Sequence, residues 1–211
     1  MTKYNYIGKT SEGLIRVKNG TFPNFQCGYI NESAQEVIPL IYTGVRDFSE
    51  GLAAVKTGNW SMGKWGFIDT GGKLVIPCLF DKPRPFSCGM AKVIYNGEWC
   101  FIDGNGNKVI SLRNYDGSSR FHNGFALVSK RHGAYSDGVY GVIDKTGVEV
   151  IPCTVKCYEL GVFFKCPCLE ESVDRFKKRF EHFICSFNLN KFSPSFHLAY
   201  EKLLNIKKSY D

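Results

Sequence analysis

The sequence predicts an all-β repeat array, built as a solenoid-like or propeller-like stack of short antiparallel meanders, with a small α-helical appendage at the carboxy terminus. Short blocks of β-branched and aromatic residues recur at a nearly constant spacing, glycine and aspartate separate the blocks, and a helical periodicity replaces them only near the end of the chain. Hydrophobic residues make up 44% of the 211 positions, which predicts a folded protein rather than a disordered chain.

The first block of each copy is a glycine followed by mainly apolar residues, as in Gly51-Leu52-Ala53-Ala54-Val55-Lys56. Equivalent blocks begin at Gly13, Gly51, Gly89 and Gly124, with spacings of 38, 38 and 35 residues. A phenylalanine stands three residues before each of the later glycines, at Phe48, Phe86 and Phe121. Because these residues recur once per copy, we expect them to pack between neighbouring copies, together with Trp65 and Trp99.

Two further blocks follow in the same order in every copy, represented by Gly66-Phe67-Ile68-Asp69 and Val75-Ile76-Pro77. Each block has the length and composition of a β-strand. The turns between these two blocks begin with Asp69, Asp103 and Asp144 and contain glycine, so we assign the carboxylates to turn capping rather than to calcium binding or acid–base chemistry. The proline predicts the end of the third strand, because it has no N–H for a further ladder hydrogen bond.

The motif Lys64-Trp65-Gly66-Phe67-Ile68-Asp69, followed by residues 72–77, Phe80-Asp81 and residues 86–91, resembles the WG repeat family, also written KWG. The resemblance covers residues 11 to 155. It implies a β-repeat protein of bacterial, phage or bacterium-associated origin that serves as an interaction module without a defined activity. The chain departs from the motif where Cys27 and Tyr140 replace the tryptophan and Cys100 replaces the glycine.

The repeat pattern decays after Pro152, and residues 158–165 are expected to form the first strand of a truncated copy. We therefore predict a repeat domain of about four units plus a partial fifth over residues 1–165, and a helical cap of two helices over residues 166–211. An apolar stripe predicts the first helix: Leu169, Val173, Phe176, Phe180, Phe183, Ile184 and Phe187. The second is expected to begin at Ser193 as N-cap with Pro194 in first position.

A hairpin of these two helices is expected to cover the apolar edge of the last repeat. The alternative is a basic helix that binds a membrane surface or a partner through Arg175, Lys177, Lys178 and Arg179.

The copies differ most in the loop between the first and second blocks, at residues 19–25, 57–63 and 129–137. Insertions at equivalent positions lie along one edge of an array and often form its binding face. These loops carry a mixture of aromatic and polar residues suited to a protein partner: Phe22, Phe25, Trp60, Met62, His132 and Tyr135. The sequence therefore predicts a protein-binding loop edge, with turns that have no binding role as the alternative.

A second candidate surface is a row of arginines that precede the repeated phenylalanine. Arg46 and Arg84 stand two residues before it, and Arg120 stands one residue before it. If the copies stack in register, the three guanidinium groups line up and suit phosphates or carboxylates. With a net charge of +7, this row makes nucleic acid or another polyanion the alternative partner, and one solvated arginine per copy is the simpler interpretation.

The remaining patterns argue against catalysis, and we predict a non-enzymatic scaffold that uses no cofactor. The sequence contains no paired nucleophile and base, no phosphate-binding glycine loop and no strong metal-ligand spacing. Cys153, Cys157, Cys166, Cys168 and Cys185 lie near His182, but their spacing is not that of zinc knuckles, so a metal or redox pair remains only an alternative to buried thiols. No export signal or membrane span is present, which predicts a soluble, cytoplasmic protein with reduced cysteines.

Overall fold

The computed structural model describes residues 3–130 and 138–156, and within these ranges every regular element is a β-strand. Fifteen described strands form antiparallel sheets, which confirms the all-β prediction. The two helices expected over residues 166–211 and the strand expected at 158–165 lie outside the described residues. The described residues also contain no helix with the length and apolar character needed to cross a membrane.

The chain divides into two compact units. The first contains the residues up to Arg113 together with Arg120–Asn123. The second contains Asn114–Ser119 and the described residues from Gly124 onward. Three of the described sheets belong to the first unit and one to the second.

The sheets of the first unit are meanders in which each strand pairs with the next along the chain. The first sheet contains β1 (Tyr6–Ser11), β2 (Leu14–Asn19), β3 (Gln26–Asn31) and β4 (Glu36–Tyr42). The second contains β5 (Gly44–Val45), β6 (Leu52–Thr57), β7 (Lys64–Asp69) and β8 (Leu74–Phe80). The third contains β9 (Ala91–Tyr95), β10 (Glu98–Ile102) and β11 (Lys108–Ser111).

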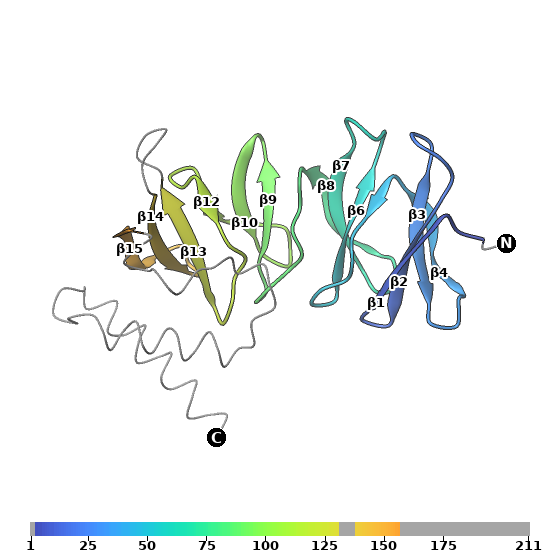
Figure 1. The fold of residues 1–211 in the computed structure, drawn as a ribbon, viewed down its shortest axis with the longest axis horizontal. Helices are drawn as coiled ribbons and strands as arrows, with labels where there is room; N and C mark the ends of the chain where they lie inside the picture. Colours follow the sequence, from blue (N-terminus) through green and yellow to red (C-terminus); the bar gives the residue numbers. More distant parts are fainter. Residues whose placement is uncertain (1–2, 131–137, 157–211) are drawn as a thin grey trace, which may run out of the picture. The chain divides into compact units, whose positions relative to one another are not determined.

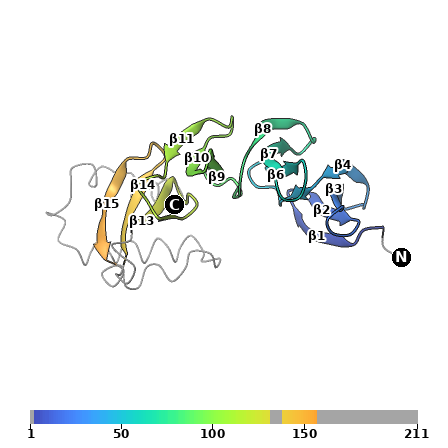
Figure 2. The same ribbon diagram turned by 90° about the horizontal axis from the view of Figure 1, so that it is seen from above.

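These three sheets follow one another in sequence order (Figure 1), and their last strands β4, β8 and β11 lie along the same side (Figure 2). The predicted blocks of the second copy correspond to β6, β7 and β8. The structure adds the short first strand β5, and an isolated bridge between Asp81 and Ile94 takes the equivalent place in the third sheet. The sequence did not predict β5 because two residues are too few to show an alternating pattern.

The core of the first unit lies between successive sheets, because alternate residues of each strand face opposite neighbours. Ala53 belongs to the apolar cluster between the first and second sheets, whereas Ala54 belongs to the cluster between the second and third. The first cluster joins residues of both sheets: Leu14, Tyr29, Ile38, Tyr42, Phe48, Ala53, Val55 and Ile68. The second does the same: Ala54, Phe67, Ile76, Phe80, Phe86, Ala91, Val93, Cys100 and Ile102.

One aromatic pair repeats at both of these junctions and once more beside the third sheet. The rings of Tyr29 and Phe48 lie 4.9 Å apart, those of Phe67 and Phe86 4.9 Å apart, and those of Phe101 and Phe121 4.7 Å apart. All six side chains are buried, which confirms that the repeated phenylalanines pack between copies. Edge-on and tilted ring pairs of this kind stabilise a fold by about 0.5–1.5 kcal/mol each beyond the area that they bury.

The proline of the third block does not end its strand, contrary to the sequence prediction. Pro39 lies within β4 and Pro77 within β8. A bulge accommodates the proline in each strand. In the second sheet, Trp65 and Phe67 are two residues apart in β7, but their partners Phe80 and Ile76 are four residues apart in β8. β8 is the last strand of its sheet, where a missing N–H breaks no ladder, so proline is tolerated there.

The aspartates between the second and third blocks cap their turns, as predicted. Asp69 Oδ1 accepts hydrogen bonds from the amides of Gly71 and Lys73, at 3.0 and 2.9 Å. Asp103 and Asp144 do the same in their own turns, and Asn31 Oδ1 accepts the amide hydrogen of Gln35 at 2.9 Å in the first copy. The carboxylates are therefore used for structure in each described copy that has one.

A ladder of serine and glutamate contacts links the tight turns of successive copies. The hydroxyls of Ser11, Ser49 and Ser87 donate to the carbonyl oxygens of Phe48, Phe86 and Phe121, at 2.6, 2.8 and 2.7 Å. Glu12 Oε2 accepts the amide hydrogen of Gly51 at 3.0 Å. Glu50 accepts those of Cys88 and Gly89 at 2.6 and 2.8 Å. Each turn thus fixes the next one along the chain.

The second unit repeats the four-stranded pattern with β12 (Gly117–Ser118), β13 (Phe125–Lys130), β14 (Val139–Asp144) and β15 (Glu149–Lys156). Its buried side chains include Ala126, Val128, Ile143 and Val150. Glu149 accepts a hydrogen bond of 2.7 Å from the Tyr115 hydroxyl and forms an ion pair of 3.5 Å with Lys130. This unit therefore has its own core and its own polar ties.

Candidate binding surfaces

Three aromatic side chains from two different copies contact one another in the loops between the first and second blocks. Phe22 and Phe25 come from the loop between β2 and β3, and Trp60 comes from the loop between β6 and β7. The ring of Trp60 lies 5.7 Å from that of Phe22 and 5.4 Å from that of Phe25, both nearly edge-on, and the two phenylalanine rings lie 6.5 Å apart. We call these three residues the aromatic loop cluster.

The members of this cluster differ in exposure. Phe22 is 68% exposed and Trp60 is 50% exposed, and the neighbouring Met62 is 77% exposed. Phe25 is only 6% exposed, so the expectation that it tips its loop is wrong. It lies beneath the other two rings, and Lys18 Nζ lies 3.6 Å from its ring centroid. Phe25 therefore supports the two exposed rings instead of offering a surface itself.

The loop that carries Trp60 is held by its own polar contacts. Asn59 Oδ1 accepts the amide hydrogen of Met62 at 2.6 Å, and the Asn59 carbonyl oxygen accepts that of Gly63 at 2.9 Å. Lys56 Nζ donates to the carbonyl oxygen of Trp60 and also lies 5.5 Å from the centre of its ring. These contacts hold the backbone of the loop around Trp60.

The other predicted members of the loop edge are not brought into this cluster. His132 and Tyr135 lie outside the described residues. The third copy has no insertion, because Asn96 and Gly97, both with positive φ, join β9 directly to β10. Within the described residues, the exposed aromatic surface thus belongs to the first two copies.

The predicted arginine row is in register at two of its three positions. The amides of Arg46 and Arg84 donate to the carbonyl oxygens of Ala54 and Lys92, at 2.9 and 2.8 Å. In the next copy Ser119, not Arg120, makes the equivalent bond, to Leu127 at 2.9 Å. Arg120 is therefore one residue out of backbone register with Arg46 and Arg84. Its place in the row stays a prediction.

The motif tryptophans pack beside the core but are only half-buried, and each has a cation above its ring. The guanidinium carbon of Arg46 lies 5.3 Å from the ring centre of Trp65, and Lys92 Nζ lies 4.7 Å from that of Trp99. Burial lowers the pKa of Arg46, and the positive charges of Arg84 and Arg16 lower this pKa further. Burial and Arg84 likewise lower the pKa of Lys92. The cations are therefore close enough to repel one another.

Arg16 and Lys92 belong to this surface although sequence reasoning missed them. Both occupy the position of Ala54 in the first block, which a comparison of the copies residue by residue could have revealed. Arg16 Nε forms an ion pair of 2.8 Å with Asp47, so its charge is compensated locally. We call Arg46, Arg84 and Lys92 the cationic row.

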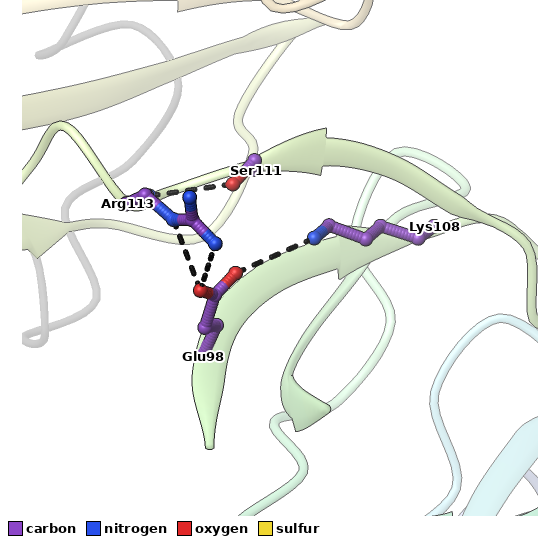
Figure 3. Close-up of polar contacts among 4 residues, drawn as sticks. All are labelled: Glu98, Lys108, Ser111 and Arg113. Carbon is purple, nitrogen blue, oxygen red and sulfur yellow. Dashed lines mark hydrogen bonds and ion pairs between the residues drawn. The ribbon is translucent and has the colours of Figure 1, made fainter. Parts of the chain in front are cut away.

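Acidic residues elsewhere in the third sheet are already engaged. Glu98 receives hydrogen bonds from Arg113, including one of 2.9 Å from Nε, and lies 3.7 Å from Lys108 Nζ (Figure 3). The hydrogen bonds from Arg113 are the main cause of a lowered pKa at Glu98. This ion-pair cluster is exposed and links β10 to β11, so we assign it a structural role.

The described cysteines are free thiols. Burial raises the pKa of Cys27, Cys100 and Cys153 above the ordinary thiol value. Among the described residues, no group of three histidine, cysteine or acidic side chains is placed to hold a metal ion. Most members of the cysteine group predicted as an alternative metal site lie outside the described residues: Cys157, Cys166, Cys168, His182 and Cys185.

Comparison with known proteins supports the repeat assignment. The family model described as "WG containing repeat" matches the chain three times, at residues 28–59, 65–99 and 101–131. No curated protein and no solved structure matches the chain. The three matches cover the second and third blocks of one copy and the first block of the next, in the order that the sheets display. Residues 28–131 of this chain are therefore similar to three successive WG-containing repeats.

Proposed function

We propose that this chain is a non-enzymatic scaffold that binds a protein partner through the aromatic loop cluster. The observation that carries the proposal is the contact between Phe22 and Trp60, two largely exposed rings that come from different copies. Exposed aromatic side chains are costly in a free monomer, and tryptophan and tyrosine dominate the binding energy of protein interfaces.

The support for the rings adds to this argument. The buried Phe25 packs against Trp60, Lys18 Nζ lies over the Phe25 ring, and hydrogen bonds within the loop hold the backbone at Trp60. A preorganised aromatic surface loses little conformational entropy when a partner binds. Met62 adds a flexible apolar side chain at the rim, which suits adaptation to a protein surface.

The wider assignment follows the same reasoning. A cytoplasmic location is proposed because the described cysteines are free thiols, and residues 166–211 are proposed to form a cap that follows the repeat domain. A non-enzymatic role is supported by the use of the repeated aspartates as turn caps.

The test is an affinity capture from the native cell with the full chain as bait. We compare the wild type with Trp60→Ala and with the double variant Phe22→Ala, Trp60→Ala, and identify captured proteins by quantitative mass spectrometry. A specific partner should be recovered by the wild type and lost stepwise in the two variants. Direct titration of the purified partner should then show a loss of affinity of about thirtyfold for Trp60→Ala, since interface hot spots contribute about 2 kcal/mol or more.

Leu74→Ala provides the matched control, because Leu74 is 49% exposed and pairs with Ile68, at the end of β7 opposite to the loop that carries Trp60. It should capture the same partner as the wild type. Circular dichroism and thermal melting of every variant check that the fold is intact. If folded Trp60→Ala captured the partner as well as the wild type did, the aromatic loop cluster would not be the binding site.

A further inference from the structure

Two arginines on neighbouring sheets, Arg46 and Arg84, carry positive charge without an ion pair among the described residues. Arg46 and Arg84 stand 38 residues apart at equivalent backbone positions, as their matching hydrogen bonds to Ala54 and Lys92 show. Neither arginine forms an ion pair with a described residue, whereas Arg16 is paired with Asp47. Asp47 is near enough to raise the pKa of Arg46, but burial, Arg84 and Arg16 each lower this pKa more than Asp47 raises it.

The guanidinium of Arg46 is held against a ring and still has a hydrogen-bond donor available for a ligand. Arg46 Nε is buried and has no hydrogen-bond partner among the described residues, although its guanidinium is stacked on Trp65. Arg84 is exposed, and its charge acts on both Arg46 and Lys92. Guanidinium groups bind phosphate oxygens in a bidentate manner, and a ring beneath the guanidinium restricts its orientation.

We propose that Arg46 and Arg84, with Lys92 beside them, form a binding site for a linear phosphate polyanion. This site is separate from the aromatic loop cluster. Consecutive sheets lie about 10 Å apart, so cations placed once per sheet suit a ligand with several phosphates better than a single small anion.

The same geometry favours recognition of phosphate groups over recognition of bases. Proteins that bind single-stranded nucleic acid stack bases on exposed aromatic rings. Here the rings of Trp65 and Trp99 are half-buried, and Arg46 and Lys92 lie above them. These cations cover the ring faces on which a base would have to stack, so the ligand contacts positive charge there.

The experiment uses the full chain with the background substitution Trp60→Phe, which leaves Trp65 and Trp99 as its tryptophans. The probe is inorganic polyphosphate of defined length, titrated while tryptophan fluorescence and heat of binding are recorded. A single-stranded oligonucleotide with a similar number of phosphates is titrated in parallel. Binding to Arg46 should change the emission of Trp65, because the cation above the ring changes its environment.

The test variant is Arg84→Gln, since Arg84 is exposed and its loss leaves the core intact. Arg113→Gln is the matched control: it removes the same charge from an exposed arginine in the same unit, paired with Glu98. Arg84→Gln should weaken polyphosphate binding about tenfold, as expected for one lost charge-assisted contact, and Arg113→Gln should have little effect. The affinity should fall steeply with salt.

Three results would overturn the proposal. The first is the absence of saturable polyphosphate binding at low salt. The second is an equal loss of affinity in Arg84→Gln and Arg113→Gln, which would show that net charge alone attracts the probe. The third is tighter binding of the oligonucleotide than of polyphosphate, which would indicate recognition of bases.

Discussion

Gly66 lies directly against the carbonyl oxygen of Ile76, so that a Cβ at position 66 would overlap this oxygen and lie 2.8 Å from the carbonyl carbon of Pro77. The same contact recurs in the first copy, where a Cβ on Gly28 would lie 2.5 Å from the oxygen of Ile38. The glycine of the motif is required because the bulge at the proline brings the backbone of the last strand towards it. The third copy has neither feature at this point: Cys100 replaces the glycine, Ser111 replaces the proline, and the pairing is regular between Cys100–Ser111 and Phe101–Ile110.

Gly66→Ala should therefore be strongly destabilising, by about 3 kcal/mol, because the rigid backbone of β8 cannot move away without losing its pairing. Cys100→Ala, at the equivalent position, should reduce the free energy of unfolding by only about 1 kcal/mol, since a Cβ is already accommodated there. Urea unfolding of the two variants beside the wild type measures the difference. Equal losses would show that the bulge does not determine the need for glycine.

The ladder between turns predicts a graded effect of its two glutamates. Glu50 accepts two amide hydrogens and Glu12 accepts one. Replacing either by glutamine leaves a single acceptor oxygen and removes the charge, so Glu50→Gln should cost about 1 kcal/mol of stability and Glu12→Gln clearly less. Thermal melts at neutral pH test the order. A larger loss in Glu12→Gln than in Glu50→Gln would contradict the ladder.

The cap at Asp103 predicts a dependence on pH. Partial burial acts to raise the pKa of Asp103, but hydrogen bonds from Asn107, Asn105 and Gly106 outweigh it and lower the pKa below 3.8. A carboxyl group whose pKa is lower in the folded state than in the unfolded state stabilises the fold at pH values above its unfolded-state pKa. This stabilisation is lost as the pH falls through the folded-state pKa.

Asp103→Ala should therefore be less stable than the wild type at pH 7, by about 1 kcal/mol, and the difference should shrink below about pH 4. Asp103→Asn is the control that keeps an acceptor oxygen, as Asn31 does in the first copy, and it should retain most of the stability. Unfolding curves between pH 7 and pH 3 provide the measurement. A difference between Asp103→Ala and the wild type that stayed constant with pH would exclude the charged cap.

The described thiols should differ in reactivity. Cys27, Cys100 and Cys153 are buried, and burial raises their pKa, so both access and the thiolate fraction are low at pH 7. Cys78 and Cys88 are half-buried. Alkylation with iodoacetamide followed by peptide mass spectrometry should label Cys78 and Cys88 well before the other three. Early labelling of Cys27 in the folded protein would contradict its place in the core.

The sequence predicted the strands because each block shows the composition, length and bounding residues of a strand, and because four copies support one another. It predicted the buried role of Phe48, Phe86 and Phe121 for the same reason. The prediction that the strand ends at Pro77 was wrong. Proline has no N–H for a further ladder bond, but β8 is the last strand of its sheet, and the sequence alone does not show this position.

The candidate surfaces were predicted in part. Phe22 and Trp60 stand out in loops that vary between copies, but the burial of Phe25 depends on Trp60 from the next copy, a contact 35 residues away in sequence. Arg120 was placed in the row by its distance from Phe121, whereas the hydrogen bond of Ser119 sets the register. In a strand, a shift of one residue turns a side chain to the opposite face, and the sequence does not reveal such a shift unless the pairing partner is known.

The contacts between turns run in one direction only: hydroxyl and carboxylate groups always come from the earlier copy, and their partners always come from the later one. A duplicated segment of 38 residues, inserted in frame, would therefore find complementary groups at both of its ends. Lengthening or shortening such a protein requires no newly invented junction, which makes copy number an easy variable for evolution and for engineering alike. Cys88, which stands where Glu12 and Glu50 stand in the earlier copies, marks the point at which this interchangeability weakens.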